Sequence, residues 1–328
     1  MPSRTLVDGM GRSLEERREW ETRKRALNEI ARDNWDDPAW RREMAQELTE
    51  TIYLGFEHEN LLGYMTQVEN ADFDERVFVK EVRGLRAFFV ARGGYIESSS
   101  VHAEVFEIPR ETVGFHVYEE EDKLRTNFAE TQATLVELGV QRLDATVNSW
   151  FFTGLQAQVT SASPYYVSVN DLSTSGTSAI NNALTAVRDV SRDWEVAIVG
   201  RSTMTDQIVN ALLGVGSQTG AGFFPELNED LMRRGVLGTY RGAKIITLKN
   251  YLDDTGTPYF PANELWVIGR DASKFAFFGG MLSKEWIENA AWEWHYLARR
   301  DAGFVVHRPD RVRRIVDSSI VPYTVIAE

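Results

Sequence analysis

The sequence contains no cysteine in its 328 residues. A chain without thiols forms no disulfide, no thiolate metal site and no cysteine nucleophile, and it fits a reducing compartment. No run approaches the roughly 18 consecutive apolar residues of a membrane-spanning helix. The first residues lack the apolar stretch of a secretory signal peptide. We therefore expect a chain that is synthesised inside the cell and has no membrane-spanning segment.

Lysine is also scarce. Only seven of the 36 basic residues are lysines, so 29 are arginines, and 49 acidic residues bring the net charge to −13. Phosphate backbones repel such an acidic surface, which argues against a protein that grips nucleic acid over its whole surface. The planar arginine side chain pairs well with carboxylates at interfaces, which favours contacts between copies of the chain. GC-rich codon usage explains the same composition equally well.

The length predicts about two domains, because domains usually hold 100 to 200 residues. Hydrophobic residues make up 43% of the chain and charged residues 26%, which is close to the average of folded proteins. A mainly disordered chain is therefore excluded.

Two charged helices are predicted near the N-terminus. Ser13 and Glu16 have the spacing of a capping box, and the residues that follow are too polar to build a core. The second helix begins at Pro38, and its apolar residues recur every four positions from Trp40 to Ile52. We expect this N-terminal arm to contact other copies of the chain. A helix pair that folds on its own chain is the alternative.

A long two-stranded excursion and a long helix are predicted next. Residues 77–118 contain four runs rich in β-branched and aromatic residues, with turn-forming residues at 92–100 between two of them. Asn127 is expected to cap a helix that runs to about residue 159, with one apolar face. Such a helix is expected to lie across a sheet.

The remaining sequence alternates between helices and strands. Helices are predicted at 177–191 and 203–213, and strands at 196–199, 243–248, 265–268 and 274–278. Near the end, Trp294 and Tyr296 alternate with polar residues, and a hairpin closes near Pro309. The overall fold class predicted is α+β.

The sequence shows no convergent catalytic site. The glycines at 214–222 lack the strand and the helix that a phosphate-binding loop needs, so a surface loop is the preferred interpretation. The five histidines are scattered, and His116 and His295 are interpreted as structural. The acidic run at 119–122 is interpreted as a solvated turn. No catalytic residue, cofactor or metal ligand is predicted, and the chain is not expected to be an enzyme.

The order of these elements resembles a known family. The resemblance is carried by residues 237–248, by the proline-containing loop at 260–263, by the strands at 265–271 and 275–279, and by the strand pair at 294–309. This order is similar to the major capsid protein of tailed bacteriophages, the Hong Kong 97-like capsid fold that encapsulin shells share. The resemblance covers about residues 70–320.

The resemblance implies a division of the chain into six segments. They are an N-terminal helical arm at 1–69, an extended β loop with flanking strands at 70–123, a spine helix of a peripheral domain at 124–165, an axial α/β domain at 166–285, returning strands of the peripheral domain at 286–314, and a C-terminal strand of the axial domain at 315–328.

The resemblance also implies a function. The chain would assemble with itself, as pentamers and hexamers, into an icosahedral head that encloses double-stranded DNA without sequence-specific binding. Its partners would be portal, scaffolding and decoration proteins, with no membrane, and it would assemble in the host cytoplasm and reside in the virion capsid. An encapsulin-type compartment around protein cargo is the alternative, and an α/β enzyme is less favoured.

Two departures from the family are expected. Some members form a lysine–asparagine cross-link, but no lysine lies between Lys80 and Lys123 in this chain. The N-terminal region is short compared with members that lose an internal scaffold, so proteolytic maturation is not expected. The residues predicted at the subunit interface are Arg92, Gly93, Gly94, Tyr95, Glu119, Glu120, Glu121, Arg311, Arg313 and Arg314. The arginines near the C-terminus are expected to pair with acidic residues of neighbouring subunits, and DNA contact is the alternative.

Overall fold

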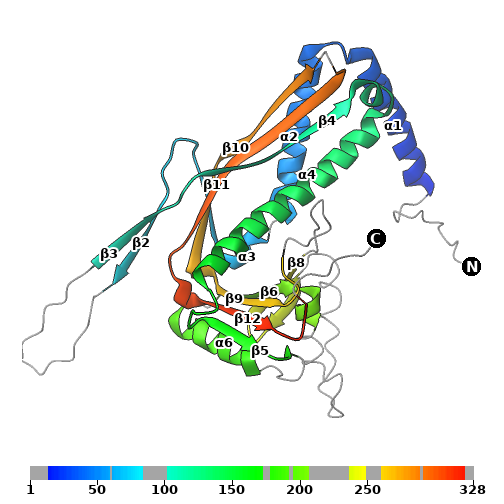
Figure 1. Ribbon diagram of the computed structural model, residues 1–328. Helices are drawn as coiled ribbons and strands as arrows, with labels where there is room; N and C mark the ends of the chain where they lie inside the picture. The colour runs from blue at the N-terminus through cyan, green and yellow to red at the C-terminus, as the bar shows by residue number, and fades with distance from the viewer. Residues whose placement is uncertain are drawn as a thin grey trace, which may run out of the picture. The chain divides into compact units, whose positions relative to one another are not determined.

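The computed structural model describes residues 14–59, 61–83, 102–172, 178–191, 195–206, 236–248, 260–288 and 291–321. The chain divides into two compact units (Figure 1). Unit 1 comprises Met1–His58, Val113–Asp144 and Gly280–Arg300, and unit 2 comprises Glu59–Thr112, Ala145–Gly279 and Asp301–Glu328. None of the helices in the described ranges is long and apolar enough to span a membrane.

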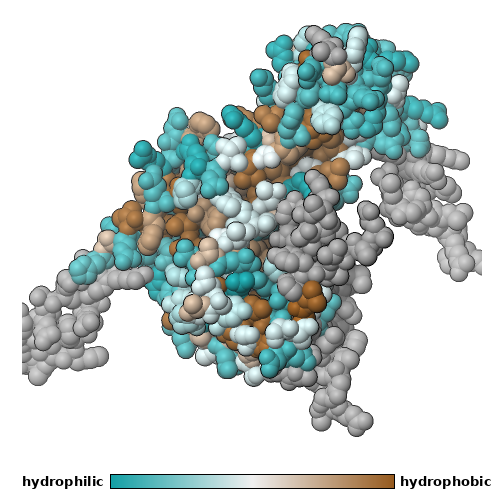
Figure 2. Space-filling view, in the orientation of Figure 1, coloured by the Kyte–Doolittle hydropathy of each residue, from teal (hydrophilic) through white to brown (hydrophobic). Residues whose placement is uncertain are grey.

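Helices α1 (Leu14–Asn34) and α2 (Pro38–Glu59) supply most of the helical residues of unit 1. Proline begins α2, as predicted, because the first helical position needs no backbone donor. In Figure 2 the visible surface around α1 and α2 is mostly hydrophilic. The apolar side of α2 is covered, since Met44, Leu48 and Ile52 are at most 6% exposed.

The apolar side of α2 therefore packs within its own chain. Trp35, between α1 and α2, is fully buried and makes edge contacts with Trp40, Phe128 and Trp294, at centroid distances of 6.1 to 6.3 Å. For the apolar residues from Trp40 to Ile52, the alternative of a helix pair packed on its own chain therefore holds. Residues far along the same chain, Phe128 and Trp294, supply the apolar partners. Contact of the arm with other copies of the chain stays a prediction.

Helix α4 (Glu121–Gln158) is the predicted long helix, but it begins six residues earlier than expected. Glu121 and Asp122 in its first turn favour helix formation there, because negative charge stabilises the positive end of the helix dipole. Asn127, the predicted cap, has non-helical angles (φ −136°, ψ 40°) inside the helix. Its amide donates to Glu130 at 2.8 Å. The capping pattern thus marks a break within α4.

A six-stranded sheet lies in unit 2. Its strand order is β5-β12-β9-β6-β8-β7. The bounds are β5 (Tyr166–Val169), β12 (Val312–Asp317), β9 (Glu264–Gly269), β6 (Val196–Arg201), β8 (Ala243–Leu248) and β7 (Val236–Tyr240). Every residue of β6 and β9 is buried. Helix α6 (Ser178–Val190) buries its apolar face, with Ile180, Leu184 and Val187, in the same core as the sheet.

A second sheet has the order β1-β10-β11-β4. Its strands are β1 (Gln67–Ala71), β10 (Ser273–Glu288), β11 (Glu293–Val306) and β4 (Glu111–Glu120). The short helix α3 (Leu62–Met65) precedes β1. Two 3-10 turns, η1 (Arg270–Ala272) and η2 (Pro309–Arg311), lie before β10 and after β11. Strand β10 is much longer than the predicted 274–278.

The predicted excursion begins as the antiparallel pair of β2 (Phe78–Arg83) and β3 (His102–Glu107). Its tip lies outside the described residues, as do the glycine-rich loop at 214–222 and most of the helix predicted at 203–213. At the base, Gly303 lets two backbone segments meet, since a Cβ there would lie 2.0 Å from the Pro109 carbonyl oxygen. A side chain at residue 303 would therefore push the strands apart.

Candidate subunit interface

Six of the ten predicted interface residues lie in the described part of the chain. Arg92, Gly93, Gly94 and Tyr95 lie outside the described residues. Of the three predicted acidic residues, Glu120 is exposed, whereas the carboxylates of Glu119 and Glu121 are paired within the chain. Glu119 is 2.7 Å from Lys123, and the buried Glu121 is 2.7 Å from Arg125. The hydrogen bonds that Arg125 donates to the Glu121 carboxylate raise the pKa of Arg125.

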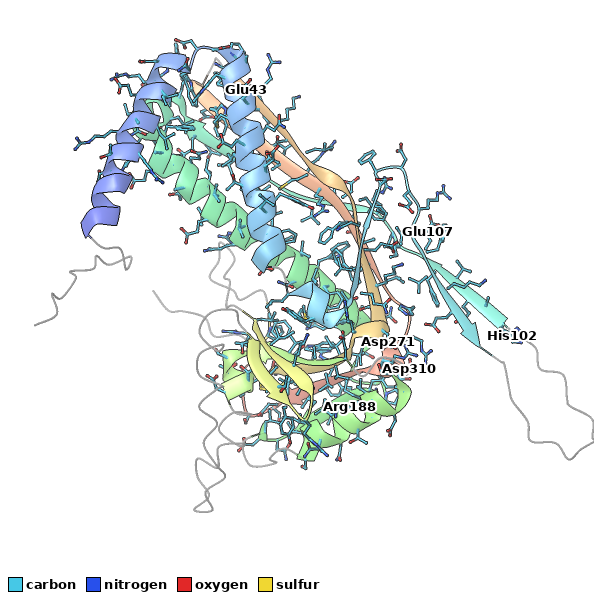
Figure 3. The ribbon with its side chains drawn as sticks, turned by 180° about the vertical axis from the view of Figure 1, so that it is seen from behind. Glu43, His102, Glu107, Arg188, Asp271 and Asp310 are labelled. Carbon is cyan, nitrogen blue, oxygen red and sulfur yellow. The ribbon has the colours of Figure 1, made fainter. Side chains whose placement is uncertain are left out.

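Arg311 is held inside unit 2. It is 2% exposed and ends η2. Its guanidinium donates to the Val190 carbonyl oxygen at 3.0 Å and forms an ion pair with Asp271, which is 5% exposed. Ser191 donates to the same carboxylate at 2.6 Å. Burial lowers the pKa of Arg311. One buried charge pair therefore joins η1, η2 and the end of α6, where Figure 3 labels Asp271.

Arg314 and Glu264 form a second internal pair. Glu264 is 4% exposed and also accepts hydrogen bonds from Gln156 and from the indole of Trp266, both at 3.0 Å. Arg314 donates to the Val159 carbonyl oxygen at 3.2 Å and lies over the Trp266 ring. The Glu264 carboxylate thus has partners from three elements of its own unit, α4, β9 and β12.

The side chain of Arg313 contacts backbone that is close to it in sequence. It donates to the carbonyl oxygens of Asp310 and Val312, at 2.7 and 2.8 Å, and its guanidinium lies 4.8 Å from the Tyr165 ring centre. Burial lowers its pKa. Contact with a neighbouring subunit through these three arginines stays a prediction. Their role within unit 2 is to satisfy backbone carbonyls and buried carboxylates.

A charged cluster sits where β2 meets the end of β11. Glu81 is 6% exposed; its carboxylate lies 3.2 Å from Arg308 and 3.4 Å from His307 Nε2. Burial lowers the pKa of His307, and the positive charges of Arg311 and Arg308 lower it further, while Glu81 opposes them. Arg308 also binds Asp310 through two hydrogen bonds of 3.0 Å. Within unit 2, this cluster ties β2 to the residues that follow β11.

This cluster predicts a loss of stability in mild acid. Because the folded state lowers the pKa of His307 from 6.5, the unfolded chain binds the proton more readily, and stability falls as the pH drops below that value. We expect His307→Gln to reduce the fall in thermal midpoint between about pH 7.5 and about pH 5.5. His102→Gln, at an exposed position, is the control and should leave it unchanged. If the thermal midpoint of His307→Gln falls with pH as steeply as that of the original chain, His307 is not the group responsible for the loss of stability in acid.

One group in the described part of the chain could hold a metal ion: Glu288, Glu293 and His295. Sequence reasoning missed it and interpreted His295 as structural. The available signal was weak, because Glu293 and His295 alternate along a strand while Glu288 lies across a turn. All three belong to unit 1.

The sequence matches no protein-family model and no curated protein. Solved structures do match. The capsid of an empty GTA particle has a TM-score of 0.56 at 11% identity, covering 78% of this chain and 89% of that one. The mature capsid of bacteriophage PhiM1 has a TM-score of 0.51 at 11% identity, covering 80% and 88%. A virus-like particle from Pyrococcus furiosus has a TM-score of 0.50 at 11% identity, covering 82% and 98%.

At identities this low, the comparisons establish the fold. In this chain the fold comprises the strand pair β2 and β3, the long helix α4, and two sheets that include the returning strands β10 and β11. The predicted α+β class and the predicted resemblance are both confirmed. This chain has the Hong Kong 97-like capsid fold of the phage capsids and virus-like particles that it matches.

Proposed function

We propose that this chain is the major capsid protein of a tailed bacteriophage, assembling with itself into an icosahedral head around double-stranded DNA. The observation that carries the proposal is the match over 89% of the empty GTA capsid chain. Pentamers and hexamers are the assembly units proposed, with portal, scaffolding and decoration proteins as partners. The host cytoplasm is the proposed place of assembly. Catalytic activity is not expected.

The excursion of β2 and β3 supports a contact with another copy. A two-stranded pair is marginally stable unless it lies on something else. Val105 on β3 is 60% exposed and Phe78 on β2 is 47% exposed, so this pair keeps apolar surface available. We assign the extended β loop to this excursion, and the spine helix to α4. Residues 166–285 are proposed as the axial domain.

Electron microscopy of the purified chain and of particles tests the proposal. Closed icosahedral shells are expected, and double-stranded DNA is expected inside native particles. Shells filled with a specific protein cargo would instead favour the alternative function, an encapsulin-type compartment. A small soluble oligomer under all assembly conditions would refute a shell function.

A single substitution tests the contact of the excursion. Val105→Asp places a charge on the exposed apolar surface of β3 and is expected to lower the yield of closed shells by about tenfold, because a buried unpaired charge at an interface costs several kcal/mol. Val105→Thr keeps the side-chain shape and is the matched control. Thermal unfolding of the unassembled subunit should be the same for both. Normal shell yield with Val105→Asp would remove this contact from the proposal.

The shell is expected to lack covalent cross-links between subunits. The chain has no cysteine, and the residues between Lys80 and Lys123 include no lysine. Denaturing electrophoresis of mature particles should give one band at 37.3 kDa. A ladder of multiples would show that another lysine forms the bond.

A further inference from the structure

We propose that Glu288, Glu293 and His295 bind a divalent transition-metal ion, with Zn²⁺ as the probe, at the turn between β10 and β11. The imidazole Nε2 of His295 lies 3.3 Å from a Glu288 carboxylate oxygen and 3.6 Å from a Glu293 carboxylate oxygen. All three ligand atoms lie within 4.8 Å of one another. In a tetrahedral zinc site, bonds of about 2.0–2.1 Å separate neighbouring ligand atoms by roughly 3.3 Å.

The Nε2 atom of His295 is buried and has no hydrogen bond. The side chain is 9% exposed, and its Nε2 atom is buried without a hydrogen bond although two carboxylates lie within 3.6 Å. An N–H donor at this position would normally be satisfied by one of those carboxylates. A buried imidazole nitrogen that points at two carboxylates without a hydrogen bond is the arrangement expected of a metal ligand. Imidazole nitrogen combined with carboxylate oxygen suits zinc and related divalent ions.

The surroundings fix the ring of His295. Its Nδ1 atom lies 3.1 Å from Nε2 of His116 on β4, so the two rings share a hydrogen bond. Trp286 stacks on the His295 ring at 5.0 Å with an angle of 2°, and on His116 at 5.2 Å. A hydrogen bond at the second nitrogen of a ligating histidine fixes its tautomer and orientation. His116 is therefore a positioning residue for the site.

The local sequence explains how the three ligands meet. Glu293 and His295 stand two residues apart on β11, so their side chains point to the same face of the strand. Glu288 ends β10, on the other side of the turn. The two carboxylates balance the charge of a divalent cation, and water completes the coordination. Bound metal would therefore clamp the turn that joins the two longest strands.

Metal content is the first test. The full chain, stripped with a chelator and dialysed against Zn²⁺, is expected to retain one ion per chain and to show a raised thermal midpoint. The double variant Glu288→Gln/Glu293→Gln should bind more than about 100-fold more weakly, since an outer partner alone is typically worth about 10- to 100-fold. Glu120→Gln, which removes an exposed carboxylate from β4, is the matched control.

The variant His116→Phe distinguishes a role of His116 in positioning His295 from a role in the stability of the fold. Phenylalanine keeps a ring beside Trp286 but removes the hydrogen bond to His295, so zinc affinity should fall by about 10- to 100-fold without a change in the metal-free thermal midpoint. Substitution with Co²⁺ gives the intense visible absorption of a tetrahedral site only if the three ligands bind together. No stoichiometric zinc in the original chain, or equal affinity in the Glu288→Gln/Glu293→Gln variant, would overturn the proposal.

Discussion

Replacing Asp271 with asparagine is expected to lower the free energy of unfolding of unit 2 by about 3–5 kcal/mol. The substitution leaves the Arg311 guanidinium buried at 2% exposure without its counter-charge. Removing one partner of a buried ion pair is costly because the remaining charge has lost its hydration and no longer has the paired opposite charge that offset this loss. Denaturant unfolding of the unassembled subunit measures the effect.

The neighbouring residue provides the control. Arg270 pairs with Glu195 at 2.6 Å, but these side chains are 40% and 58% exposed. Glu195→Gln should therefore cost less than about 1 kcal/mol, as exposed ion pairs do. The double variant Asp271→Leu/Arg311→Met removes both charges and should recover much of the loss. Similar costs for Asp271→Asn and Glu195→Gln would show that the Asp271–Arg311 pair contributes little.

The Asp271–Arg311 pair complicates any test that replaces the three C-terminal arginines to probe a subunit interface. A combined alanine substitution of Arg311, Arg313 and Arg314 is expected to destabilise unit 2, because Asp271 and Glu264 would both lose their buried partners. Failed assembly of that variant would then report misfolding. Substituting the exposed Glu120 is a cleaner test of a contact between subunits.

Trp35→Ala is expected to lower the free energy of unfolding of unit 1 by about 3–5 kcal/mol. Trp35 is fully buried and touches three aromatic rings, so alanine would leave a large cavity among Trp40, Phe128 and Trp294. Chemical denaturation followed by circular dichroism measures the loss. The prediction also means that deleting residues 1–35 removes a core side chain as well as the polar helix.

An exposed tryptophan gives the matched control. Trp292 is 71% exposed, so Trp292→Ala makes the same chemical change at the surface and should alter stability by less than about 1 kcal/mol. If Trp35→Ala and Trp292→Ala unfold at the same denaturant concentration, the aromatic cluster does not stabilise unit 1.

Local patterns predicted the elements whose signals lie within a short stretch of sequence. The strand expected at 243–248 is Ala243–Leu248, and the helix expected at 177–191 is Ser178–Val190. Both follow from periodicity of apolar residues, which depends only on near neighbours. The order of such elements was sufficient to predict the capsid fold.

Partners distant in sequence could not be predicted. Arg311 and Arg314 appeared as a basic surface cluster, yet Asp271 and Glu264 lie 40 and 50 residues away along the chain. Composition gives no information about which carboxylate faces which guanidinium after folding. The candidate group around His295 could not be predicted for a related reason, because Glu288 reaches it only when the turn between β10 and β11 brings the strands together.

The position of β12 has a consequence for synthesis. Strand β12 lies between β5 and β9, with Arg314 opposite Tyr166 in parallel register. Between the end of β5 and the start of β12 lie about 140 residues, so a ribosome adding roughly 5–20 residues per second needs about 7–30 s to make the missing strand. Until then β5 has no partner and β9 has an open edge. A growing or truncated chain therefore exposes strand edges that can pair wrongly, and only a chain translated through β12 can close this sheet.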